Sequence, residues 1–467
     1  MRTDRIAILA LLALSTVLKF SWLGVNPLDG DEPFTLYWAT RPWGEFTAML
    51  RTENNPPLYF LLVRAWAALV PWEEVWLRLP SALFSVLTVW PLYGAARALY
   101  RASHPPEGGS MEGGRAMAVC ACGLFTLNNH QYIFAHELRG YALFLLLAVV
   151  ALRLLLGEGQ RQGWRGALPL GLVFAGLVWT HFFGGLVIGL CVLCALVLPE
   201  LRPACRRTLI AAAMAAAAFL PYAYIFFRRA GESIVHGTWV EPQGIDELWH
   251  MTRRWSNQPV VTLLLLVPLV VTAVREPLRP LALRFALLWW LAPLLGLWLV
   301  QAWVPAYVDR YLLFASPGFY MAAAYGLVRC VPTGRARWLA PVAGVLGMAC
   351  SFTPWMANGN RPDLVAAQVR AWQAEDAGRP VLVRPFWYKP TLWTQLERSP
   401  APAPWRETWS ERYDDARSPG ALEDSGSFIL VYASARTDGE DAPSFHGFHV
   451  REDHRCDRLM HVALYAR

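Results

Sequence analysis

Three carboxylates stand within four residues of one another in the stretch Asp29-Gly30-Asp31-Glu32-Pro33. Like charges this close repel one another, so we expect at least one of the acids to resist ionisation unless a cation lies among them. Carboxylates of this kind suit abstraction of a proton from a hydroxyl. A structural interpretation also exists, because acids before a proline favour the positive end of the helix that follows.

A second polar cluster is the stretch Glu53-Asn54-Asn55-Pro56-Pro57-Leu58-Tyr59. A helix break with Asn55 as the N-cap accounts for the amide and the two prolines. It does not account for Glu53, so a functional role for the cluster stays open.

A third cluster is His136-Glu137-Leu138-Arg139-Gly140-Tyr141, which follows Asn128, Asn129, His130 and Gln131. So many hydrogen-bonding groups beside apolar segments are costly unless they face a polar cavity. We therefore expect Glu137 and Arg139 to line such a cavity.

Two further candidates occur later in the chain. Arg310 can pair with Asp309 or extend its charge to water, but its guanidinium can also clamp a phosphate. His181 lies on the same predicted side of the membrane, where a lone histidine is more often structural than catalytic.

Composition indicates which elements must position these residues. The 467 residues are 55% hydrophobic and 16% charged, whereas a soluble domain carries about a quarter charged residues. This excludes intrinsic disorder and a simple cytosolic enzyme and indicates a polytopic α-helical membrane protein. About eleven spanning helices are expected, near 6–25, 79–98, 116–135, 141–156, 167–181, 183–199, 208–227, 258–274, 284–303, 311–330 and 338–355.

Arginines supply the expected orientation. With the N-terminus inside, the inside segments hold 17 arginines against six acids, and the rest of the chain has a net charge of −4. This is the positive-inside pattern of a multi-pass membrane protein whose N-terminus is cytoplasmic. The overall charge of +7 is then a topology signal and does not indicate a nucleic-acid partner.

Three long segments are predicted on the external side. The first loop, about 26–78, contains two stretches typical of interfacial helices, 33–52 and 57–70. The second, 228–257, is polar and could form a mobile lid. After about 356 the apolar runs shorten to strand length, which predicts a small external α/β domain. The expected division is therefore a membrane module, 1–355, and a soluble domain, 356–467.

The motifs together resemble the GT-C superfamily of polyprenyl-phosphate-sugar-dependent glycosyltransferases. Within it they are similar to the glycosyltransferase family 39 type, related to protein O-mannosyltransferases and lipid A aminoarabinose transferases. The resemblance rests on Asp31-Glu32, Asn55-Pro56-Pro57-Leu58-Tyr59, Arg78-Leu79-Pro80-Ser81, Glu137-x-Arg139-x-Tyr141, Thr180-His181-Phe182-Phe183, and Arg310-Tyr311 before Pro317.

This resemblance implies an inverting transferase that moves a sugar from a polyprenyl-phosphate donor to an acceptor hydroxyl at the external face of the bacterial cytoplasmic (inner) membrane. Asp31 would be the catalytic base, with Glu32 beside it. The donor phosphate and substrate would meet Arg139, Glu137, Arg310, Tyr311, Asn55, His181 and Tyr59.

Metal use stays open, because some relatives use a divalent metal and others none. The candidate ligands are Asp29, Asp31 and Glu137. The chain also departs from the family pattern, since relatives often have His or Lys before the Pro-Pro pair where this chain has Asn54-Asn55.

Two other functions remain as alternatives. A lipid or sugar transporter or flippase would place ionisable residues near the middle of the membrane and repeat the two halves of the chain. A non-catalytic scaffold would use the C-terminal domain to bind partners at the envelope. For a transferase, the acceptor could be a glycan, a lipid or a protein.

Overall fold

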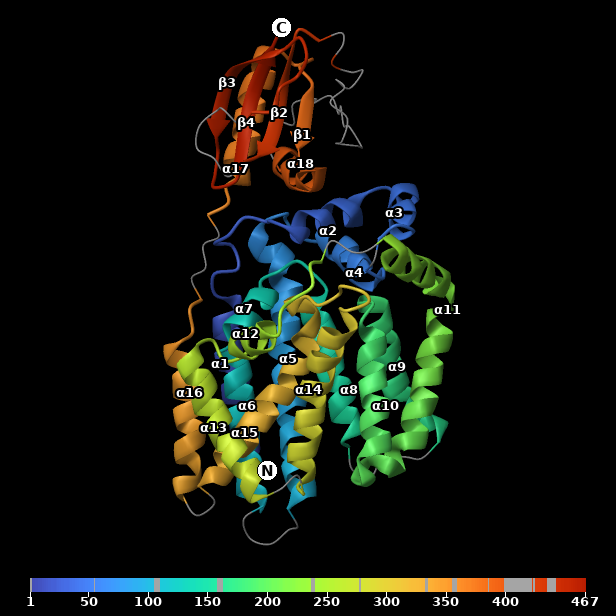
Figure 1. Ribbon diagram of the computed structural model, residues 1–467, viewed down its shortest axis with the longest axis vertical. Coiled ribbons are helices and arrows are strands. Elements are labelled where there is room, and N and C mark those ends of the chain that lie inside the picture. The colour runs from blue at the N-terminus through green and yellow to red at the C-terminus, as the bar shows by residue number, and fades with distance from the viewer. Residues whose placement is uncertain are drawn as a thin grey trace. The chain divides into compact units, whose positions relative to one another are not determined.

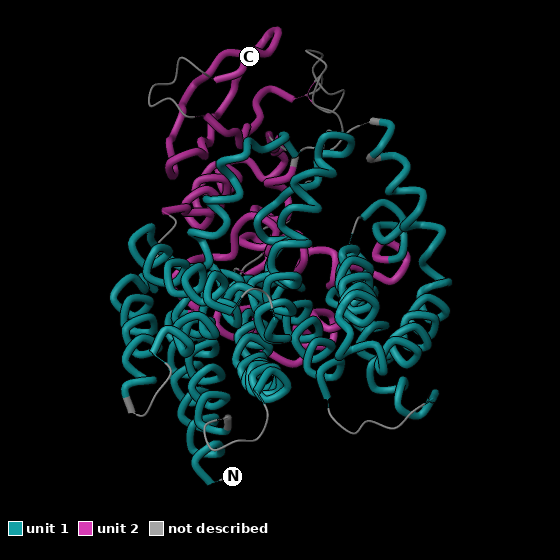
Figure 2. The backbone as a smooth tube through the Cα atoms, turned by 60° about the horizontal axis from the view of Figure 1, so that its bottom comes forward, with its two compact units in different colours: residues 1–22, 47–61, 78–355 teal, residues 23–46, 62–77, 356–467 magenta. Residues whose placement is uncertain are grey.

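The computed structural model describes residues 2–53, 55–104, 110–157, 163–236, 240–276, 279–331, 335–354, 359–384, 386–398, 422, 425–434 and 442–467. It divides into two compact units, coloured separately in Figure 2. The helical unit comprises 1–22, 47–61 and 78–355, and the mixed unit comprises 23–46, 62–77 and 356–467. These units describe packing, so the division into a membrane module and an external domain at 355/356 stays a prediction.

A helix lies within each predicted spanning segment (Figure 1), and the chain is a polytopic membrane protein. By length and composition, four continuous helices among the described residues can cross a membrane, and a bent pair would make a fifth. The count of eleven spans therefore stays a prediction. The helices are α1 (Arg2–Phe20), α5 (Glu74–Ser103), α6 (Ser110–Thr126), α7 (Asn129–Ala135), α8 (Tyr141–Leu155), α9 (Trp164–Thr180), α10 (Gly184–Val197), α11 (Cys205–His236), α12 (Asp246–Arg254), α13 (Pro259–Arg275), α14 (Leu281–Val300), α15 (Ser316–Cys330) and α16 (Leu339–Cys350).

Two breaks interrupt the helices, and one of them lies inside a predicted span. The segment predicted as one helix over 116–135 is α6 followed by α7, and α12 meets α13 at 95°. Asn128 explains the first break, because its side chain accepts a hydrogen bond from the Gln131 backbone N–H at 3.0 Å and caps α7. At the second break Asn257 adopts the left-handed conformation, with φ 65°.

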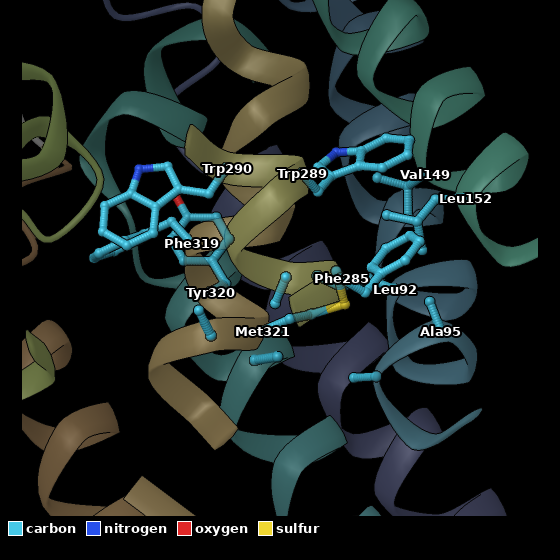
Figure 3. Packing of buried hydrophobic residues seen from close by; sticks show 14 of the residues in the cluster. Leu92, Ala95, Val149, Leu152, Phe285, Trp289, Trp290, Phe319, Tyr320 and Met321 are labelled. Carbon is cyan, nitrogen blue, oxygen red and sulfur yellow. The ribbon is translucent and has the colours of Figure 1, made fainter. Parts of the chain in front are cut away.

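Helix α15 lies at the centre of the helical unit, and all of its residues from Ser316 to Val328 are buried. A Cβ added to Gly318 would lie 2.6 Å from the Trp290 backbone nitrogen, and one added to Gly326 would lie 2.5 Å from Leu269 Cα. Glycine at both positions therefore lets α15 pack against α14 and α13. Figure 3 shows the large side chains that fill the space around these close approaches, among them Phe285, Trp289, Trp290, Phe319 and Tyr320.

The first long loop, predicted over about 26–78, is helical as expected, but its helices have different boundaries. The stretch 33–52 forms two helices, α2 (Asp31–Thr40) and α3 (Trp43–Leu50), which are separated at Arg41 and Pro42. Helix α4 (Leu58–Ala67) follows the two prolines.

The C-terminal part of the mixed unit contains α17 (Pro362–Glu375), α18 (Lys389–Glu397) and a four-stranded sheet. The strand order is β1 (Val381–Arg384), β2 (Ser427–Ala433), β4 (Met460–Ala466), β3 (His449–Arg455). Strands β1 and β2 are parallel, and the other neighbours are antiparallel. One face of the sheet packs on α17 and α18 through residues such as Val431, Val462, Trp372 and Leu392.

Candidate active site

The first-loop acids occupy the start of α2. Gly30 precedes the helix with φ 57° and ψ −120°, a conformation that favours glycine. The Glu32 N–H donates to the Asp29 carbonyl at 3.2 Å, and the Asp29 N–H donates to the Glu32 carboxylate at 3.3 Å. This reciprocal pair orders the turn with Glu32 buried and Asp31 exposed.

Asp29 is the acid that resists ionisation. Its pKa is raised, first by burial and then by the charges of Glu32 and Asp457, although hydrogen bonds from Gly30 and Asn360 act the other way. The Asn360 side-chain amide donates to its carboxylate. The expectation that at least one acid of the cluster resists ionisation is therefore confirmed.

The second cluster differs from its predicted capping role. Helix α4 begins at Leu58, and the Leu61 N–H donates to the Pro57 carbonyl at 2.9 Å, so Asn55 is not its N-cap. The side chain of Asn55 instead donates to the Glu53 carboxylate at 2.8 Å, as its backbone N–H does at 3.1 Å. Asn54 lies outside the described residues.

Tyr59 connects this loop to the turn that carries Arg139. Its hydroxyl lies 2.8 Å from Ser81 Oγ, which in turn donates to the Arg139 carbonyl at 3.5 Å. A Cβ on Gly140 would lie 3.3 Å from Tyr59 Cβ and 3.4 Å from Thr180 Cγ2, so glycine permits this close packing. Arg139 is buried, and its guanidinium lies 5.9 Å from the ring centre of Tyr141.

His181 occupies an aromatic pocket in the turn between α9 and α10. Its Nδ1 accepts a hydrogen bond from the Phe183 N–H at 3.1 Å, which leaves the proton of a neutral ring on Nε2. That buried Nε2 has no hydrogen-bond partner among the described residues. The ring centres of Tyr141 and Tyr311 lie 5.9 and 5.3 Å from that of His181.

Arg310 extends this group of residues. Its guanidinium lies 5.7 Å from the ring centre of Tyr311. Tyr59, Arg139, His181, Tyr311 and Arg310, all candidates from the sequence, are thus linked by contacts within the helical unit. Two guanidiniums and an N–H donor in a largely buried setting suit an anion such as a phosphate. Glu137 is half-buried in the turn before Arg139.

The Asp309 carboxylate has partners that the sequence reasoning missed. It accepts the Arg310 backbone N–H at 2.7 Å and lies 3.4 Å from His130 Nε2 and 3.8 Å from Arg254 Nε. The Arg254 guanidinium also pairs with Glu247. These contacts fix the backbone from which Arg310 projects. The positive charge of Arg254 within the polar segment 228–257 was the available signal.

Asn257, like Arg254, was not identified from the sequence as a candidate residue. Its Oδ1 accepts from Asn128 Nδ2 at 2.9 Å and from the Asn129 N–H at 2.8 Å, and its Nδ2 donates to the Leu127 carbonyl at 2.9 Å. The Asn128 side-chain amide and the Asn129 backbone N–H thus hold the two helix breaks together, whereas the Asn129 side chain donates to the Ser351 carbonyl at 3.1 Å.

For the metal question, no group of three or more His, Cys, Asp or Glu side chains within the described part of the chain is placed to hold an ion. Asp29 and Asp31 belong to the mixed unit and Glu137 to the helical unit.

Comparison with known proteins gives a fold but no close sequence relative. The sequence matches no protein-family model and no curated protein. Among solved structures, it is similar to ArnT from Cupriavidus metallidurans in the apo state, with a TM-score of 0.63 and 12% identity over 98% of this chain and 97% of that one. The same protein bound to undecaprenyl phosphate gives a TM-score of 0.64, with the same identity and coverage.

A third solved structure is more distant. The Archaeoglobus fulgidus oligosaccharyltransferase, tethered to an acceptor peptide, has a TM-score of 0.50 and 10% identity over 83% of this chain and 63% of that one. ArnT, a lipid A aminoarabinose transferase, and the oligosaccharyltransferase are both GT-C proteins. The chain therefore shares its fold with ArnT and, more distantly, with the oligosaccharyltransferase.

Proposed function

We propose that the protein is an inverting glycosyltransferase that moves a sugar from a polyprenyl-phosphate donor to an acceptor hydroxyl at the external face of the cytoplasmic membrane. In this reaction a base removes the hydroxyl proton, and the oxygen attacks the anomeric carbon from the face opposite the phosphate. The bond from that carbon to the phosphate oxygen breaks, and the polyprenyl phosphate leaves as an anion.

The observation that carries the proposal is the contact series from Arg139 through Tyr141, His181 and Tyr311 to Arg310. Guanidiniums hold phosphate through charge-assisted hydrogen bonds, and burial of Arg139 strengthens them by excluding water. The undecaprenyl phosphate in the solved ArnT complex is a ligand of the same chemistry. Its presence in a protein of this fold supports a polyprenyl phosphate as the leaving group.

Asp31 is the proposed base. It is exposed in the first turn of α2, while the buried Glu32 carboxylate is engaged by the Asp29 backbone. Because Asp31 is exposed, an acceptor can reach its carboxylate, whereas burial hinders access to Glu32. Glu137 and Asn55 stay proposed substrate contacts, and Asp29, Asp31 and Glu137 stay the proposed ligands if a divalent metal takes part.

The remaining proposals concern placement in the cell. Eleven spans with the N-terminus inside would put both the acid turn and the C-terminal α/β region, residues 356–467, on the external side. The proposed span number and orientation rest on the alternation of arginine-rich segments along the sequence.

The test is sugar transfer in proteoliposomes that contain the full chain and a panel of polyprenyl-phosphate sugars. Asp31→Asn should abolish transfer, whereas Glu45→Gln, which changes an exposed acid on α3, should leave it unchanged. Transfer by the Asp31→Asn variant at the wild-type rate would exclude Asp31 as the base. Absence of transfer by the wild type with every donor and acceptor would exclude the enzyme.

A further inference from the structure

Helix α18, far along the chain, packs directly against helix α2. The Trp393 side chain is 7% exposed, and its ring meets that of Tyr37 edge to face at 4.9 Å and 90°. The Arg41 guanidinium, at the end of α2, lies 4.2 Å from the ring centre of Tyr37 and 4.5 Å from that of Trp393. A cation held against two aromatic rings fixes their relative positions.

A second contact holds the neighbouring first-loop segment. Arg398, the residue after α18, forms an ion pair with Glu74 at 2.5 Å, and both side chains are mostly buried. The ring of Trp72 lies 6.0 Å from that of Trp393. The first loop therefore contacts α18 at Trp393, through Tyr37 and Trp72, and pairs with the residue that follows the helix through Glu74.

The opposite end of α2 has its own contact with the C-terminal segment. Asn360 stands two residues before α17, and its amide donates to the Asp29 carboxylate just ahead of the acid turn. Within the first loop, Arg64 Nη1 donates to the carbonyls of Ala39 at 2.8 Å and Arg41 at 2.6 Å. C-terminal residues thus contact α2 at both of its ends, with Asp31 and Glu32 between them.

We propose that Trp393 and Asn360 are positioning residues, through which the C-terminal region fixes the acid-bearing turn of α2 for catalysis. Only the activity readout of this inference rests on the proposed function. A helix of ten residues has little stability of its own in water, so its position depends on tertiary contacts. A displacement of about 1 Å in a reacting group can lower a rate by about 100-fold.

The first measurement needs no activity. Hydrogen–deuterium exchange of the full chain in detergent should show faster exchange of the α2 amides in Trp393→Ala than in wild type. Trp393→Phe retains an aromatic ring and should restore most of the protection. Trp387→Ala, which removes a tryptophan that is 48% exposed and precedes α18, is the matched control and should exchange like wild type.

The second measurement separates positioning from substrate binding. Trp393→Ala should lower kcat at least about tenfold, as a shift of well under 1 Å would do, while the KM for the lipid donor stays the same. Arg41→Ala removes the cation from the α2 side and leaves the C-terminal region intact. It should also speed exchange of the α2 amides and lower kcat, and it replaces Trp393→Ala as the test if that variant does not fold. Asn360→Leu should also lower kcat without changing the donor KM.

Wild-type protection of α2 in both Trp393→Ala and Arg41→Ala would overturn the proposal. Faster exchange of α2 with an unchanged kcat would also overturn it, because the contact would then be structural only. If the wild type transfers no sugar, the proposed function fails, and loss of α2 protection would still support the positioning contact.

Discussion

The side-chain amide of Asn128 donates to Asn257 Oδ1 at 2.9 Å and so joins two breaks in helices that lie 129 positions apart in sequence. Asn128 stands between α6 and α7, and Asn257 between α12 and α13. Because α7 carries His130 and α12 carries Arg254, the same pair of asparagines brings together the two side chains that lie beside Asp309. The position of Arg310 therefore depends on residues that make no contact with substrate in the proposed reaction.

Replacement of Asn257 tests this connection. Asn257→Ala removes the hydrogen bonds to Leu127, Asn128 and Asn129 and strains a backbone with φ 65°. Each buried group left unpaired costs roughly 1–3 kcal/mol, so the thermal midpoint in detergent should fall by several degrees. Asn257→Gly relieves the backbone strain but loses the side-chain hydrogen bonds. Asn257→Asp keeps an oxygen that can accept from Asn128 and Asn129. If the glycine variant were as stable as wild type, the hydrogen bonds would have no stabilising role.

Gly30 offers a test of the acid turn. A side chain at φ 57° and ψ −120° costs about 1–3 kcal/mol, so Gly30→Ala should shift the first turn of α2 and lower kcat. Open space surrounds this position, so the effect would come from backbone strain rather than from a clash. Gly44→Ala on α3 is the control, since a Cβ there also meets nothing within 4 Å and its φ is not positive. Equal kcat values for the two variants would contradict the prediction.

Arg139 tests the phosphate site. Arg139→Lys retains the charge but loses the planar fork that holds two phosphate oxygens. We expect its kcat/KM to fall by about 10-fold or more, corresponding to at least about 1.4 kcal/mol, with a larger loss in Arg139→Ala. Measurement of undecaprenyl phosphate binding should show weaker affinity in the same order. Wild-type affinity in Arg139→Ala would remove Arg139 from the proposed donor site.

The stability of the protein should depend on pH through His136, in the turn between α7 and α8. Burial, with the positive charge of Lys19, lowers the pKa of this histidine from 6.5 to about 3. Its Nε2–H donates to the Lys19 carbonyl at 2.9 Å. As the pH falls from about 6.5 towards 3, the unfolded chain binds a proton that the folded chain does not, so stability falls.

The matched variant is His136→Gln, which keeps a donor near the Lys19 carbonyl but cannot titrate in this range. Its thermal midpoint should fall less than that of wild type between pH 6.5 and pH 4. Parallel pH curves for the two proteins would show that His136 does not cause the acid sensitivity.

The sequence predicted the helical segments well because long apolar runs are the dominant signal in a membrane chain. It did not predict the break at Asn128, because the apolar residues on both sides of the polar stretch 128–131 keep the average hydropathy of a window high. Strand β3 was not predicted either, because its sequence lacks an apolar pattern. Its residues, His449–Arg455, are mostly charged and exposed at the edge of the sheet, so they lack the alternation of a half-buried strand.

The candidate residues were identified by their polarity beside apolar segments, but their contacts were not. The approach of Tyr311 to His181 follows from packing between segments far apart in sequence, which local patterns do not encode. Asn55 shows the opposite error, because its sequence context favours an N-cap while its side chain pairs with Glu53. Asn257 lacked any neighbouring motif, and its importance depends on tertiary structure alone.

The mixed unit is built from segments far apart in the chain, so it cannot finish folding until its C-terminal residues have been synthesised. Asn360 follows Asp29 by 331 positions, and Arg398 follows Glu74 by 324. At about 5–20 residues per second, a ribosome needs roughly 15–65 seconds to make the chain between such partners. The membrane segments leave the ribosome first, and α2 lacks its C-terminal contacts until residues 360–398 have been made. A chain truncated before residue 360 would carry the acids of the first loop without the partners that hold their helix.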